Sequence, residues 1–174
     1  MSSTGVSTNN IASALVAELE HEAAVTRTCL ERVPADKFDW KPHEKSMTFG
    51  TLAGHIAEMV GWTPGIMEQA ELDFAKMDYK PFEPKSTEDL VEYLDKNVTE
   101  AIETLKNASD ERFLETWTMK NGEKTYFTLP KIAVMRSFVM SHIIHHRGQL
   151  SVYLRLNDIS VPSIYGPSAD EGQM

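Results

Sequence analysis

The sequence of 174 residues contains a single cysteine, Cys29, and this scarcity excludes two kinds of site. One cysteine cannot form a disulfide within the chain, and it cannot supply the several thiolates of a zinc–cysteine cluster. Cys29 itself lies in an apparent amphipathic helix, where a cysteine usually fills apolar space. A metal site in this protein would therefore use histidine, carboxylate or water ligands.

Long apolar runs and clusters of basic residues are also missing. No apolar run reaches the roughly 18 residues that a membrane-spanning helix needs, and the polar first ten residues lack the features of a secretion signal. The chain has 17 basic and 26 acidic residues, a net charge of −9, so most of its surface would repel a nucleic acid. We therefore expect a soluble, cytoplasmic protein that binds neither membranes nor nucleic acid.

Hydrophobic residues recur at helical spacing in four stretches of the sequence. These stretches cover residues 11–33, about 48–76, 86–105 and 130–156. Ser86 is a suitable N-cap for the third helix. Because Pro64 lies inside the second stretch, we expect a kink or a break near residues 61–65.

Residues 115–129 have a different pattern, with two β-prone runs on either side of Asn121-Gly122. This arrangement is typical of a short hairpin. Four long helices with one hairpin predict an all-α fold, a four-helix bundle with a short β-hairpin before the last helix. The length suits a single domain over residues 1–174, with disordered or loosely packed ends at about 1–8 and 167–174.

Three of the six histidines lie close together in residues 141–150, SHIIHHRGQL. His142 and His146 are four residues apart, so on a helix both rings can reach one point, a recurrent arrangement for binding a metal. His145 is three residues from His142 and can also face inward. However, adjacent side chains on a helix diverge by about 100°, so His145 and His146 cannot easily share one ion.

His55 is the best candidate for a third ligand because its neighbours are small or apolar. Gly54 and Ala57 would allow another helix to approach closely. His21 lies in an acidic stretch and His43 in a loop, so we leave both out of the site. A lone histidine such as His55 is more often a hydrogen-bonded structural residue, whereas a pair four residues apart on an apolar helix is less often accidental.

Two charged residues near these histidines leave alternatives open. Glu58, about one turn from His55, can act as a proton acceptor, or it can be a carboxylate that is solvated or that contacts a metal ligand. Arg147 can hold an anionic substrate or form an outward-facing ion pair. Gln149 can tie the last helix to a neighbour.

Four stretches of the sequence resemble the DinB/YfiT-like family of damage-inducible proteins. Residues 142–150, HIIHHRGQL, with Tyr153-Leu154-Arg155, are similar to the family's last helix. Residues 33–42 (VPADKFDWKP), 48–57 (TFGTLAGHIA) and 161–168 (VPSIYGPS) are similar to the segment after its first helix, the start of its second helix and its ending. The resemblance covers nearly the whole chain, and the histidine string is its most specific part.

The resemblance implies a four-helix bundle in which His55 of the second helix and His142 and His146 of the last helix hold one divalent metal ion. It also implies a homodimer. Imidazole ligands suit both Zn²⁺ and Ni²⁺, so the residue types do not choose between them.

Three histidine ligands leave at least one position on the ion for water or substrate, as in catalytic zinc sites. By resemblance to members of the wider superfamily, we expect a metal-dependent thiol S-transferase that joins a low-molecular-weight thiol to a small electrophile. Two alternatives stay open. One is a metal-dependent hydrolase that uses a bound hydroxide, and the other is a non-enzymatic metal- or ligand-binding protein of a stress response.

Overall fold

The computed structural model describes residues 10–172, and most of them are helical. The helices are α1 (Asn10–Leu30), α2 (Phe49–Met59), α3 (Thr63–Glu68), α4 (Thr87–Lys106), α5 (Asp110–Leu114), α6 (Lys131–Val134) and α7 (Ser141–Leu156). A π-helical turn, Met135–Met140, joins α6 to α7. The strands are β1 (Glu71–Asp73), β2 (Thr116–Asn121) and β3 (Lys124–Pro130).

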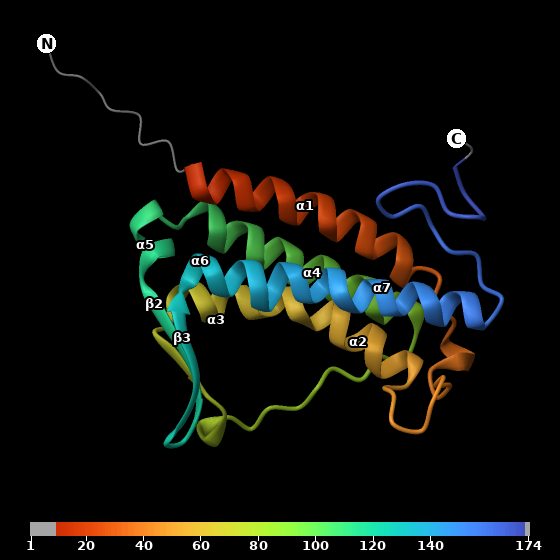
Figure 1. The fold of residues 1–174 in the computed structure, drawn as a ribbon, viewed down its shortest axis with the longest axis horizontal. Helices are drawn as coiled ribbons and strands as arrows, with labels where there is room; N and C mark the ends of the chain where they lie inside the picture. The colour runs from red at the N-terminus through yellow and green to blue at the C-terminus, as the bar shows by residue number, and fades with distance from the viewer. Residues whose placement is uncertain (1–9, 173–174) are drawn as a thin grey trace, which may run out of the picture.

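The longer helices α1, α2, α4 and α7 lie side by side and enclose the main hydrophobic core (Figure 1). Helix α1 contacts α4 and α7, and α2 contacts the same two helices. Each helix contributes fully buried side chains, among them Leu19, Ile56, Leu94 and Leu150. Burial of this apolar surface is the main term that favours folding.

Side-chain caps explain where two of these helices begin. The Thr48 hydroxyl accepts a hydrogen bond from the N–H of Thr51 at the start of α2. Ser86, the N-cap expected from the sequence, accepts one from the N–H of Asp89 at the start of α4. Each cap pairs one of the backbone donors that a first helical turn leaves free.

The stretch expected as one helix over residues 48–76 is divided in the structure. Helix α2 ends at Met59, a 3-10 turn covers Val60–Trp62, and α3 has Pro64 in its first turn. The break therefore falls where Pro64 predicts it. The expectation of helix to residue 76 is wrong, because α3 ends at Glu68 and the chain continues as β1 and a 3-10 turn, Phe74–Lys76.

The three strands form one sheet in the order β1-β2-β3. Strands β2 and β3 pair antiparallel, and β1 pairs parallel with β2. Gly122, between β2 and β3, has a φ of +59°, a conformation that glycine adopts without strain. The Asp73 carboxylate accepts hydrogen bonds from the N–H groups of Gly122 and Ala75 at 2.8 and 3.1 Å, and thereby fastens β1 to this turn.

Much of the expected loosely packed ends, at 1–8 and 173–174, lies outside the described residues. Within residues 167–172, two side chains form ion pairs: Asp170 with Arg155, and Glu171 with Arg32. This segment therefore contacts both α7 and the residues just after α1. In the part of the chain that the structure describes, no helix is long and apolar enough to cross a membrane.

Gly54 of α2 lies directly against the segment before α4, and this contact gives a test of the fold. A Cβ at Gly54 would lie 2.8 Å from the carbonyl oxygen of Phe82 and 3.1 Å from Cδ of Pro84. We expect Gly54→Ala to lower the free energy of unfolding by about 1–3 kcal/mol, because the segment must move away. The measurement is urea-induced unfolding.

Gly65→Ala in α3 is the matched control, since a Cβ there meets nothing within 4 Å. We expect this variant to be as stable as the unmodified protein or slightly more stable, because alanine favours a helix over glycine. Equal unfolding midpoints for the two variants would contradict the close approach at Gly54.

Candidate metal centre

Three histidines from two helices converge in the structure. His55 comes from α2, and His142 and His146 come from successive turns of α7. One ring nitrogen of each lies within 4.8 Å of those of the other two. The ring centres are 5.3 Å apart for His55 and His142, 4.9 Å for His55 and His146, and 4.7 Å for the two rings on α7.

These distances fit a single divalent ion. A tetrahedral ion bonded to three imidazole nitrogens at about 2.0–2.1 Å would hold the ring centres about 5 Å apart. The observed separations lie close to this value. Small side-chain rotations would bring the nitrogens from their present spacing to the shorter distances that coordination requires. Among residues 10–172, this is the one group of three or more His, Cys, Asp or Glu side chains that can hold a metal.

Hydrogen bonds leave the Nε2 atoms of the two α7 histidines free to bind a metal. Nδ1 of His142 lies 3.3 Å from the carbonyl oxygen of Phe138, in the π-helical turn before α7. A carbonyl oxygen only accepts, so Nδ1 carries the proton and Nε2 has the lone pair. Partners of this kind fix the ring orientation of metal-ligating histidines.

Gln149 does the same for His146. Its side-chain oxygen lies 2.7 Å from Nδ1 of His146, and its amide nitrogen lies 3.2 Å from Nε2 of His145. Because the amide donates to His145, its oxygen is directed toward His146 and accepts the Nδ1 proton. The sequence suggested only that Gln149 ties the helix to a neighbour, so this role in orienting His146 was missed.

Burial keeps the three rings neutral at physiological pH. The pKa of His55 is lowered from 6.5 to about 4, chiefly by burial and also by the nearby His146 and His142. The pKa values of His142 and His146 are also lowered, chiefly by burial. Neutral imidazole is the form that binds metals, so the cluster needs no loss of protons before an ion can bind.

The other histidines lie apart from this cluster. The side chains of His21 and His43 are exposed, as the sequence suggested. His145 is exposed as well, and it contacts the site only through Gln149 and the edge of the His146 ring. The rings that converge are thus those of His55, His142 and His146, and the ring of His145 lies outside the group.

Two sequence interpretations need correction: that Glu58 is solvated, and that Arg147 holds a substrate or faces outward. Glu58 is 8 % exposed rather than solvated, and its Oε2 accepts a hydrogen bond of 2.7 Å from the Tyr79 hydroxyl. Arg147 is 1 % exposed and forms an ion pair of 2.6 Å with Glu22 of α1. Arg147 therefore faces neither a substrate nor solvent, because its guanidinium is enclosed between α1 and α7.

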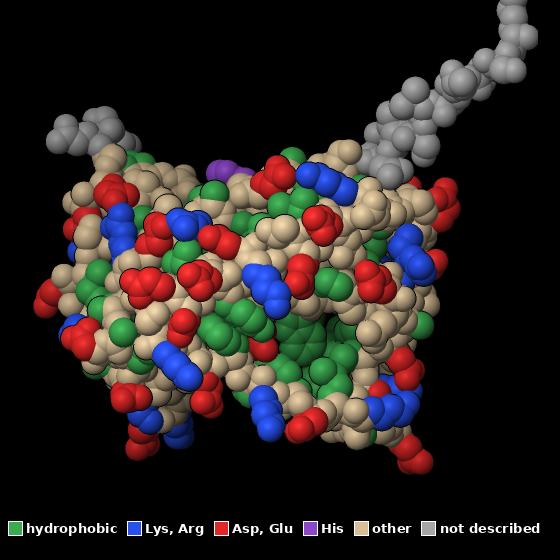
Figure 2. Space-filling view, turned by 180° about the vertical axis from the view of Figure 1, so that it is seen from behind, with side chains coloured by type: hydrophobic (Ala, Val, Ile, Leu, Met, Phe, Trp, Pro, Cys, Tyr) green, Lys and Arg blue, Asp and Glu red, His purple; other side chains and the backbone are tan. Residues whose placement is uncertain are grey.

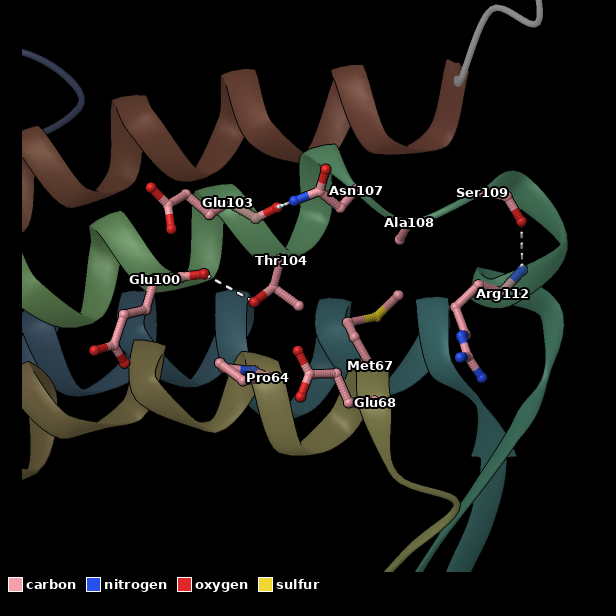
Figure 3. Close-up of a pocket in the computed structure, with 10 residues that line it drawn as sticks. All are labelled: Pro64, Met67, Glu68, Glu100, Glu103, Thr104, Asn107, Ala108, Ser109 and Arg112. Atoms are coloured by element: carbon pink, nitrogen blue, oxygen red, sulfur yellow. Dashed lines mark hydrogen bonds between the residues drawn. The ribbon is translucent and has the colours of Figure 1, made fainter.

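A large open pocket of about 630 Å³ lies away from the histidines, between α3 and the end of α4 (Figure 3). Glu68, Glu100, Glu103 and Arg112 are among its lining residues. The hydrogen bonds drawn there join Thr104 to the Glu100 carbonyl, Asn107 to the Glu103 carbonyl and the Arg112 N–H to Ser109. These bonds stabilise the local helices, so we place the candidate site at the histidines.

The fold and the cluster together define a helical protein with three convergent histidines. Comparison with protein families identifies the chain more closely, because the model of the DinB family matches residues 1–173. The chain belongs to the DinB family.

Individual relatives agree with this membership. The chain is 25% identical over 153 residues to the uncharacterized protein YrdA of Bacillus subtilis (strain 168). The alignment covers 87% of this chain and 86% of the relative. The structure is similar to the crystal structure of a DinB-like protein, YjoA, from Bacillus subtilis, with a TM-score of 0.68, 20% identity, and 86% and 96% of the two chains covered. A DinB-like protein from Bacillus cereus ATCC 10987 gives a TM-score of 0.66 at 20% identity, with 88% and 97% covered. These two structural similarities concern the fold alone.

The lowered pKa of His55 predicts how the stability of the metal-free protein depends on pH. The pKa is about 4 in the folded protein and about 6.5 in the unfolded chain, so the unfolded chain binds more protons between these values. The stability contributed by this neutral ring is therefore fully present above about pH 6.5 and is lost as the pH falls toward about 4.

Urea unfolding in the presence of a chelator, repeated between about pH 7 and pH 4.5, measures this loss. We expect a shallower decline for His55→Gln, which removes the titrating ring. His43→Gln, in an exposed loop, should retain the original decline. Parallel curves for His55→Gln and the unmodified protein would show that His55 does not contribute to the pH dependence.

Proposed function

We propose that this protein binds one divalent metal ion, Zn²⁺ or Ni²⁺, through His55, His142 and His146. The observation that carries the proposal is the convergence of three neutral rings whose centres are 4.7–5.3 Å apart. Two of the rings already have their Nδ1 protons hydrogen bonded, so their Nε2 lone pairs are available. A set of three protein ligands is also the arrangement that leaves room for a substrate or water.

The chemistry of the site follows from its charge. A bound divalent ion would supply Lewis acidity that lowers the pKa of a thiol or a water molecule. The three imidazole ligands are neutral, so they would bind the ion without cancelling its charge. Phe138 and Gln149 hold two of these rings in position, and Arg147 is held in its own ion pair away from the site.

The specific activity we propose is thiol S-transfer to a small electrophile. The sulfur of a low-molecular-weight thiol would form a bond to the electrophilic carbon while the leaving group departs with its bonding electrons, and the thiol proton would pass to solvent. Membership of the DinB family and the resemblance of the histidine string to that family support this choice over a hydrolase. A metal-dependent hydrolase or a non-enzymatic metal-binding protein is the alternative.

The proposal includes the expected scaffold. In it, α1, α2, α4 and α7 form a four-helix bundle, β2 and β3 form the hairpin before the last helix, and the protein acts as a homodimer. The contacts of α1 and α2 with both α4 and α7 support the bundle. Size-exclusion chromatography with light scattering measures the oligomeric state.

Metal content tests the ligand assignment through two adjacent histidines. We expect about one Zn²⁺ or Ni²⁺ ion per chain in the purified protein by elemental analysis, and less than about a tenth of that in His146→Ala. His145→Ala is the matched control and should retain most of its metal, because His145 lies outside the cluster. Circular dichroism confirms that both variants fold. Equal metal content in the two variants would overturn the assignment.

Thiol-dependent turnover tests the transferase proposal. The metal-loaded protein is incubated with a panel of small cellular thiols and the chromogenic electrophile 1-chloro-2,4-dinitrobenzene. We expect product to form faster than without protein, and we expect the excess to require both thiol and metal and to be lost in His146→Ala. His145→Ala should retain it.

Two other outcomes would reject the transferase. Metal-dependent hydrolysis of an activated ester without any thiol would favour the hydrolase. A lower unfolding temperature after chelation, with no turnover in either assay, would favour a structural or ligand-binding role for the ion.

A further inference from the structure

A second pocket, of about 520 Å³, lies beside α2 on the side of α4 and β1. Figure 2 shows a hollow with a hydrophobic interior on the face seen from behind. Aromatic rings form much of the pocket wall, with Trp62, Tyr79, Tyr93 and Trp117 among the lining residues. The rings of Trp62 and Tyr79 are in contact, with their centres 5.8 Å apart. This is a concave surface with aromatic walls and a few polar groups, of the kind that binds small molecules.

Glu58 contributes a buried carboxylate to this aromatic wall. Its hydrogen bond from the Tyr79 hydroxyl supplies a neutral donor. In the described part of the chain, the Glu58 carboxylate has no ion pair with a lysine, arginine or histidine. A carboxylate removed from water is unfavourable unless a cation or several donors compensate it. A cation bound next to Glu58 would therefore be stabilised.

The other charged residues of the pocket do not compensate the charge of Glu58. Lys96 lines the pocket, but its side chain is 66 % exposed, and its ammonium group lies 3.9 Å from the Glu100 carboxylate rather than at Glu58. The charged lining residues are Glu58, Glu100 and Lys96, so the pocket has a net negative charge. Burial raises the pKa of Tyr79, and the hydrogen bond to Glu58 raises it further, so the hydroxyl remains a neutral donor.

Asn97 of α4 provides a second acceptor, and its side chain lies against α2. Its amide nitrogen donates to the carbonyl oxygen of Ala57 at 2.9 Å, which fixes the orientation of the side chain. The side-chain oxygen then lies beside Gly61, where a Cβ would approach it to 2.9 Å. Glycine at this position therefore leaves space for an oxygen acceptor next to the Glu58 turn of α2.

We propose that this pocket binds a small organic ammonium compound, with its cationic group at Glu58 and Asn97 and its apolar body among the aromatic rings. An ammonium group has three donors and no acceptor, which matches a carboxylate and an amide oxygen. The faces of Trp and Tyr rings also attract cations. An anionic ligand would be repelled by Glu58. The proposal does not depend on the metal at the histidines.

Binding of 2-phenylethylamine, compared with its uncharged analogue 2-phenylethanol, tests the proposal. Isothermal titration calorimetry or ligand-observed NMR with the full chain measures both affinities. We expect the amine to bind at least about tenfold more tightly than the alcohol, because a charge-assisted hydrogen bond replaces a neutral one. Equal affinities, or no saturable binding of the amine, would overturn the proposal.

Two variants and a chelator locate the binding site. Glu58→Gln keeps the size of the side chain and should remove the preference for the amine, while Glu68→Gln, which lines the other pocket, should retain it. Binding of the amine should persist after chelator treatment. Loss of binding on chelation, or an unchanged preference in Glu58→Gln, would assign the amine to the histidines or elsewhere and overturn the proposal.

Discussion

A buried ion pair between Arg147 and Glu22 sets the rotation of α7, and the histidine cluster depends on it. The guanidinium donates to the Glu22 carboxylate at 2.6 Å, to the Tyr165 hydroxyl at 2.6 Å and to the Thr26 hydroxyl at 3.1 Å. Adjacent side chains on a helix diverge by about 100°. Holding Arg147 against α1 therefore turns its neighbour His146 toward α2. Removing either charge would leave the other buried without compensation, so the pair resists rotation of the helix.

Helix rotation brings the rings together, but it does not decide which nitrogen of each ring faces the centre. That choice depends on acceptors within the last helical segment: the Phe138 carbonyl for His142 and the Gln149 side chain for His146. The π-helical turn over Met135–Met140 carries Phe138 immediately before α7. Such turns are frequent at functional sites. Here the turn supplies a hydrogen-bond acceptor at the start of the histidine helix.

Spacing within a helix made the two histidines of α7 recognisable from sequence, because positions four residues apart share a face whatever the fold. Contacts between distant segments could not be predicted in this way. The Arg147 partner lies 125 residues earlier, so neither sequence interpretation of Arg147 included a buried pair. The helix expected to residue 76 failed for the same reason, since β1 is defined by pairing with β2. Burial of Glu58 likewise depends on Tyr79, which reaches it from beyond the end of α3.

The histidine cluster and the aromatic pocket are neighbours because both use α2. Glu58 lies about one turn from His55 in α2, and Trp62 ends the 3-10 turn that follows this helix. The Trp62 ring contacts Phe138, whose ring contacts His142, with centres 5.6 and 5.9 Å apart. The ring contacts from Trp62 through Phe138 to His142 therefore link the aromatic pocket to the histidine cluster.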